Sequence, residues 1–163
     1  MLSTARRQAL LTLLEMYMRP PVRSELAFDV DHIQPDDSRI HQLDNTARES
    51  VQRAFFLKKQ LAQASYAYYR SSSPQDQHKL EQILHRFMPL LSGMANDMFL
   101  SNRVGHKWTS LVDDVTESAQ QIFDLLSMED ADAAHFIETR TDAFVYNAHA
   151  LISLYVLSHD QHL

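Results

Sequence analysis

Apolar residues recur every three to four positions along most of this chain, which is the period of an amphipathic helix. The pattern runs through residues 4–18, 44–70, 74–99, 106–126 and 128–158. Polar residues fill most of the positions between, so each segment has one face suited to burial and one suited to water. The pattern predicts four long helices and, at the N-terminal end, a shorter one.

The apolar stripes of these segments define a predicted core. Its members on the four long segments are Ala47, Val51, Ala54, Phe55, Leu61, Ala62 and Tyr68; Leu80, Ile83, Leu84, Phe87, Leu91, Met94, Ala95 and Met98; Trp108, Leu111, Val112, Val115, Ala119 and Ile122; and Ala134, Ile137, Phe144, Val145, Ala148, Leu151, Ile152 and Tyr155. Lys58 interrupts the first of these stripes. We expect its aliphatic stem at the edge of the core and its charge outside.

Cap and breaker residues mark several segment ends. Pro20 and Pro21 end the first segment, because proline lacks the N–H donor and disfavours helix in the residue before it. Thr46 and Glu49 have the spacing of a capping box at the start of the second segment. Pro89 falls inside the third segment, where we expect a kink or a break.

Amphipathic helices joined mostly by short connectors indicate an all-α fold, an antiparallel bundle of about five helices in a single domain spanning residues 1–163. The exception among the connectors is the crossover of residues 19–43 after the first helix. A connection of that length is uncommon in a compact domain and usually has some structure or purpose of its own. Within it, Leu26, Phe28 and Val30 alternate with less apolar residues, which predicts a short half-buried strand and a partly extended crossover.

Composition narrows the chemistry. The chain has 163 residues, no cysteine, two glycines and a formal net charge of −6. Without cysteine there is no thiol catalysis, disulfide or cysteine-bound zinc, and a cytoplasmic location is expected. No phosphate-binding glycine loop occurs, the acidic balance disfavours nucleic acid as a partner, and no apolar run is long enough to span a membrane.

The strand-like stretch leads into Asp31 and His32, followed by Ile33 and Pro35. This "DHI-x-P" sequence resembles the first strand of HNH-type nucleases. The resemblance implies that His32 is a general base activating water, and that Asp29, Asp31 and His32 lie where a divalent metal such as Mg²⁺ would be held. A hard cation with carboxylate ligands would stabilise the charge that develops on a phosphate.

The resemblance covers residues 29–35 and can be extended to Asn45, Lys58 and Lys59. The chain departs from the family beyond that, because Phe55 and Phe56 stand near the position of a second metal-binding residue. In the other interpretation this segment is a polar crossover. There Asp29, Asp31 and Asp36 are solvated and Ile33 anchors the loop.

Nine histidines raise the question of a metal-centred bundle. His135 and Glu138 are three positions apart, with His149 further along the same segment. Di-iron bundles carry Glu-x-x-His pairs on two helices and further glutamates on two more. Here the order is reversed and occurs once, so we predict no cofactor and expect the histidines at the surface or rim.

The stretch "SYAYYR", residues 65–70, cannot direct Tyr66, Tyr68, Tyr69 and Arg70 into one core from a single helix end. We expect Tyr68 in the core and the other three at a binding surface, because tyrosine and arginine are favoured at interface hot spots. A further set of apolar residues exceeds what one stripe requires: Phe56, Leu57, Met98, Phe99 and Leu100. Surplus apolar residues on helices suggest a second buried face or a partner subunit.

The sequence therefore predicts a non-catalytic interaction, adaptor or regulatory module with a protein partner or with itself. Its predicted binding residues are Phe56, Tyr66, Tyr69, Arg70 and Phe99. The alternative function is a small metal-dependent HNH-like nuclease that uses the Asp31-His32 motif.

Overall fold

The fold is described from a computed structural model, which places residues 3–5, 8, 23–101, 107–128 and 133–159. Four long helices dominate: α4 (Asn45–Ser71), α5 (Pro74–Ser101), α6 (Lys107–Ser127) and α7 (Ala134–Ser158). Two short helices, α2 (Glu25–Asp29) and α3 (Ser38–His41), lie in the crossover before α4. The predicted all-α bundle is confirmed. All but a few residues of the first predicted helix, 4–18, lie outside the described residues.

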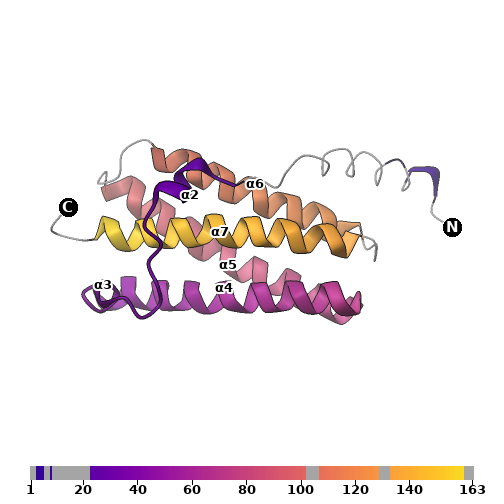
Figure 1. The fold of residues 1–163 in the computed structure, drawn as a ribbon, viewed down its shortest axis with the longest axis horizontal. Coiled ribbons are helices and arrows are strands. Elements are labelled where there is room, and N and C mark those ends of the chain that lie inside the picture. The colour runs from indigo at the N-terminus through magenta and orange to yellow at the C-terminus, as the bar shows by residue number, and fades with distance from the viewer. Residues whose placement is uncertain (1–2, 6–7, 9–22, 102–106, 129–132, 160–163) are drawn as a thin grey trace.

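Helix α7 is the centre of the bundle (Figure 1). It packs closely against α4 on one side and α6 on the other, and also contacts α5, α2 and α3. Its apolar residues are accordingly spread around the helix, as expected for an element covered on nearly every side. Among the described side chains of α7, only those of Thr139 and Asp142 are exposed.

Local sequence explains the ends of α4 and the start of α5. The carboxylate of Asp44 accepts a hydrogen bond from the amide of Ala47 at 2.8 Å and caps α4. The predicted Thr46 capping box is therefore wrong by two residues, since Thr46 already lies inside the helix. Ser72 ends α4 with φ of 51°, a left-handed conformation that reverses the chain, and Pro74 then opens α5.

Helix α5 continues through Pro89, so of the kink or break predicted at this residue the break is excluded. Proline in a helix removes one backbone hydrogen bond, that of the carbonyl four residues earlier. Pro89 and His85, which carries that carbonyl, are both exposed. Water can therefore solvate the carbonyl, and the packed apolar face of α5 holds the helix together.

Nearly all of the predicted core positions are buried, including every one on α5. Val112 and Val145 are half-buried, and Ala62 is exposed, contrary to prediction. Leu57 is buried instead, at 4% exposure. Because α4 packs against both α5 and α7, its buried sector is wider than a single stripe and is shifted away from Ala62.

The short strand predicted around Leu26, Phe28 and Val30 is wrong, because Leu26 and Phe28 lie within α2 and Val30 is its C-cap. Burial has a period of three: Ser24, Ala27 and Val30 face inward, and Phe28 is 65% exposed. A strand needs a neighbouring strand for its backbone hydrogen bonds. The described part of this fold provides none, so the segment satisfies its amides within a turn of helix.

Candidate functional site

The crossover lies across the outer face of α7, passing from the α6 side of the bundle to the α4 side (Figure 1). Buried polar groups of α7 hold it in place. The amide of Ser24 donates to Oδ1 of Asn147 at 2.9 Å, and the amide of Ile33 donates to Oγ of Ser153 at 2.9 Å. These bonds give Asn147 and Ser153, both fully buried, hydrogen-bond partners in the crossover.

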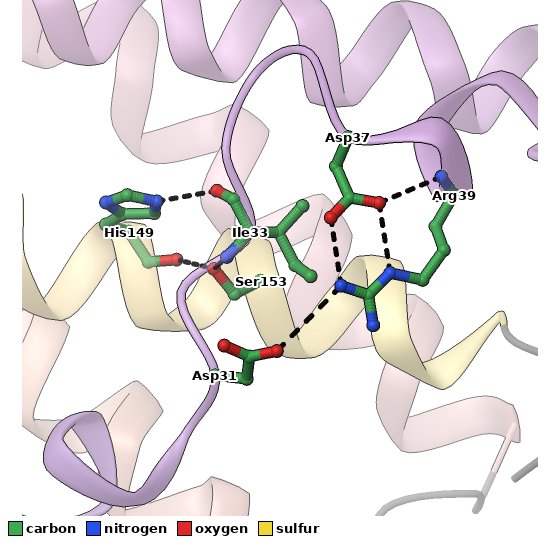
Figure 2. Close-up of polar contacts among 6 residues, drawn as sticks. All are labelled: Asp31, Ile33, Asp37, Arg39, His149 and Ser153. Atoms are coloured by element: carbon green, nitrogen blue, oxygen red, sulfur yellow. Dashed lines mark hydrogen bonds and ion pairs between the residues drawn. The ribbon is translucent and has the colours of Figure 1, made fainter.

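His149 completes this attachment (Figure 2). Its Nε2 lies 2.8 Å from the carbonyl oxygen of Ile33 and therefore carries the proton that it donates. Its Nδ1 lies 3.2 Å from Nζ of Lys58 on α4 and accepts from that ammonium group. The two bonds fix a neutral imidazole between the crossover and two helices.

The surroundings disfavour a second proton on His149. Burial lowers its pKa below the ordinary value, and electrostatic interactions with Lys58 and His32 lower it further, against the opposing effect of the bond to Ile33. Burial also lowers the pKa of Lys58. The half-buried placement of Lys58 agrees with the predicted edge position, although its ammonium group turns to an imidazole as well as to the rim.

His32 lies beside this cluster. Its Nε2 donates to the carbonyl of Ala27 at 2.9 Å, and its ring contacts those of Tyr146 and His149 at centroid distances of 5.1 and 4.7 Å. Thus His32 of the nuclease-like motif and Lys58 are brought together through His149. This relationship joins residues far apart in sequence.

The carboxylates of that motif lie elsewhere. The Asp31 side chain is 78% exposed and its Oδ2 lies 3.8 Å from Nη2 of Arg39 (Figure 2). Asp29 and Asp36 are exposed and Ile33 is 1% exposed, as predicted for a polar crossover anchored by Ile33. Among the residues that the structure describes, no three His, Asp or Glu side chains are grouped to hold a metal ion.

Asp37 caps α3 in the last part of the crossover. Its carboxylate accepts from the amide of Arg39 at 2.9 Å, which caps α3, and from Nε and Nη2 of the same residue at 3.0 and 2.9 Å. These hydrogen bonds lower the pKa of Asp37 to about 2. The result is a rigid turn that directs the chain into α4.

The predicted binding residues are all exposed, but they do not form one surface. Phe56, Tyr66, Tyr69 and Arg70 lie on α4, where the guanidinium of Arg70 stands 5.7 Å from the Tyr66 ring centroid. Phe99 lies near the end of α5, with its ring 6.1 Å from that of Trp108 on α6. The α4 residues are thus one group and Phe99 a separate one.

Other predicted positions divide between core and surface. Tyr68 is buried as predicted, and so are Leu57 and Met98 from the surplus set. Leu100 is 72% exposed. The sequence interpretation missed Phe28 as a surface residue, because a strand would have turned it inward, and it missed the joining role of His149. The side chain of His135 lies outside the described part.

Comparison of the chain with models of protein families, with curated proteins and with solved structures gave no match. No helix among the described residues is both long and apolar enough to cross a bilayer.

Proposed function

We propose that this protein is a non-catalytic interaction module, an adaptor or regulatory subunit, that binds a protein partner through the exposed face of α4. The observation that carries the proposal is the exposure of Phe56 and Tyr66, at 59% and 53%, on a well-packed helix. Both side chains point away from a core that is complete without them. We place this activity in the cytoplasm.

The composition of this face supports binding. Aromatic side chains bury a large area with little loss of conformational freedom, and arginine adds a polar tip that can pair with carboxylates. Phe56 and Tyr66 are ten residues apart, which is about 15 Å along the helix. Arg70 stands over Tyr66 and extends the same face by another turn. A partner lying along α4 could contact all three.

The crossover supports the same function indirectly. Its hydrogen bonds to Asn147, His149 and Ser153 attach the crossover to the outer face of α7. Because the crossover leads directly into α4, this attachment helps to hold α4 in place relative to the other helices. A rigid scaffold limits the ordering cost when a surface binds. In this proposal His32 and Lys58 stabilise the scaffold and take no part in chemistry.

A binding experiment with matched variants tests the proposal. The immobilised wild-type chain is used to capture proteins from an extract of the native organism, and each captured protein is then purified and titrated. The double substitution Phe56→Ala and Tyr66→Ala should weaken binding by at least about tenfold, since central aromatic anchors contribute about 1–2 kcal/mol or more each. Gln75→Ala with Gln82→Ala, exposed on α5 and outside this face, is the control and should bind like the wild type.

Two results would contradict the proposal. The first is equal affinity of the aromatic variant and the wild type for every captured protein. The second is a Mg²⁺-dependent nuclease activity of the purified chain that His32→Ala abolishes, which would establish the alternative function.

A further inference from the structure

Charge is segregated between the helices of this acidic chain. Helix α4 carries five Arg and Lys residues against one Glu, although the whole chain has a formal net charge of −6. Helix α6 carries four Asp and Glu residues against one Lys, and α2 carries two acids and no base. Helix α4 is therefore net positive in a chain whose formal net charge is negative.

The two kinds of charge face opposite sides of the molecule. Helix α4 packs chiefly on α5 and α7, and α6 packs chiefly on α7. Helix α2 contacts α6 and α7. Figure 1 shows α7 running between α6 and α4. One molecule thus presents a basic side and, across the bundle, an acidic side.

The basic surface is formed by exposed residues of α4: Arg53, Phe56, Lys59, Tyr66 and Arg70. It is the face already proposed to bind a partner. Within the described residues, none of its three cations takes part in an ion pair, since those pairs involve Arg39 and His85. Two aromatic rings are therefore bordered by cations that form no ion pair within the described part of the chain, although Glu49 lies one turn before Arg53.

The acidic surface is formed by α2 and α6: Glu25, Phe28, Asp29, Asp113 and Glu117. Phe28 is 65% exposed and has carboxylates on both sides along the chain. It is the counterpart of the basic surface, with an apolar anchor beside acidic residues, and one cation, Arg23, lies over the Tyr146 ring that Phe28 contacts.

The topology brings the members of the acidic surface to one level of the bundle. The amide of Ser24 bonds to Asn147, which lies thirteen residues after the start of α7. Asp114 lies thirteen residues before the end of α6. Because α6 and α7 are antiparallel and joined at those ends, α2 stands beside the turns that contain Asp113 and Glu117.

We infer that the basic surface of one copy of this chain binds the acidic surface of a second copy. The inference rests on the proposed function and names its partner. Phe28 packs against the Phe56 and Tyr66 side of α4, and the surrounding opposite charges fix the orientation and accelerate encounter. Since the two surfaces face opposite directions, the contact is head-to-tail, and it continues into an open series or closes into a ring.

Sedimentation velocity on the full chain tests this inference. Concentrations from about 1 to about 200 μM are compared in about 50 mM and about 500 mM NaCl, because added salt screens charges across an exposed interface. At low salt the average mass should rise with concentration beyond that of a dimer. At high salt it should fall towards the monomer.

Charge reversal gives the sharper comparison. Arg53→Glu with Lys59→Glu makes the basic surface net negative, and Asp29→Lys with Glu117→Lys removes the net negative charge of the acidic surface. Each variant alone should stay monomeric, whereas an equimolar mixture should associate, which also shows that both variants are folded. The control is Lys79→Glu with Arg86→Glu, which makes the same change in net charge on exposed positions of α5 and should associate like the wild type.

A wild-type chain that is monomeric throughout this range overturns the inference, and so does a control pair that loses association to the same extent as the α4 pair. Binding of a single-stranded oligonucleotide to the basic surface in place of self-association overturns it as well. The proposed function fails separately. If the chain is monomeric but Phe56→Ala with Tyr66→Ala still loses a captured protein, the interaction module stands and only the identity of its partner changes.

Discussion

The imidazole of His149 donates to the carbonyl oxygen of Ile33 at 2.8 Å and so ties the crossover to the central helix. The two residues are 116 positions apart. The opposite nitrogen of the ring accepts from the Lys58 ammonium group, so the ring has no site for a second proton unless that bond breaks. A neutral histidine is therefore part of the folded structure.

Stability should fall in mild acid because of His149. Its pKa in the folded protein lies below the ordinary 6.5, whereas the unfolded chain takes up the proton near 6.5. The unfolded state thus binds more protons as the pH drops below about 6.5, and the free energy of unfolding decreases until the pH reaches the lowered pKa. Urea unfolding at about pH 7.5 and about pH 5.5 measures the difference.

The variant His149→Gln isolates this effect. Glutamine can donate to Ile33 and accept from Lys58 but does not titrate, so the loss of stability between the two pH values should be smaller than in the wild type. His41→Gln, at an exposed position, is the control and should keep the full dependence. An unchanged slope in His149→Gln would show that other groups cause the acid sensitivity.

The crossover should respond very differently to truncation at two of its apolar residues. Ile33 is 1% exposed, and Ile33→Ala should lower the free energy of unfolding by about 2–4 kcal/mol through lost burial and a cavity. Phe28 is 65% exposed, and Phe28→Ala should cost less than about 1 kcal/mol. Chemical denaturation gives both values. A larger loss of stability in Phe28→Ala would contradict the exposed position of this residue and would favour the inward-facing strand predicted from the sequence.

Asp37 should stabilise the protein at neutral pH and cease to do so in strong acid. Its pKa is about 2 in the folded protein against an ordinary 3.8, so its contribution is complete above about pH 4 and is lost as the pH falls towards 2. Asp37→Asn removes the charge that pairs with Arg39 but keeps an oxygen able to cap α3, with an expected cost of up to about 1 kcal/mol near pH 7. Asp36→Asn, fully in solvent, should have almost no effect in the same unfolding assay.

Tyr155 should ionise at a higher pH than an ordinary tyrosine. Burial and the neighbouring carboxylate of Asp97, which accepts from its hydroxyl at 3.2 Å, raise its pKa to about 12. The folded state keeps the proton that the unfolded chain loses near pH 10. The contribution of Tyr155 to stability is therefore complete below pH 10 and is lost as the pH rises from there to about 12. Ultraviolet titration should show a phenol that ionises near pH 12 and is absent in Tyr155→Phe. That variant should lose about 1 kcal/mol at neutral pH.

The helices and most of the core could be predicted from the order of residues alone, because side-chain periodicity is a local property and helical hydrogen bonds join residues four apart. The stripe from Leu80 to Met98 could be predicted completely for this reason. Ala62 could not, since the width of the buried sector of α4 depends on which helices lie beside it.

The conformation of the crossover, and the residues of α4 and α7 that it contacts, depend on how the helices pack together. Alternation over five residues fits a strand, and the lack of a neighbouring strand among the described elements turns the same residues into α2. His32, Lys58 and His149 are separated by up to 117 positions in sequence. Their meeting, and the opposite placement of the basic α4 and acidic α6, follow from the order in which the helices pack around α7, which is set by contacts between segments and not by any one of them.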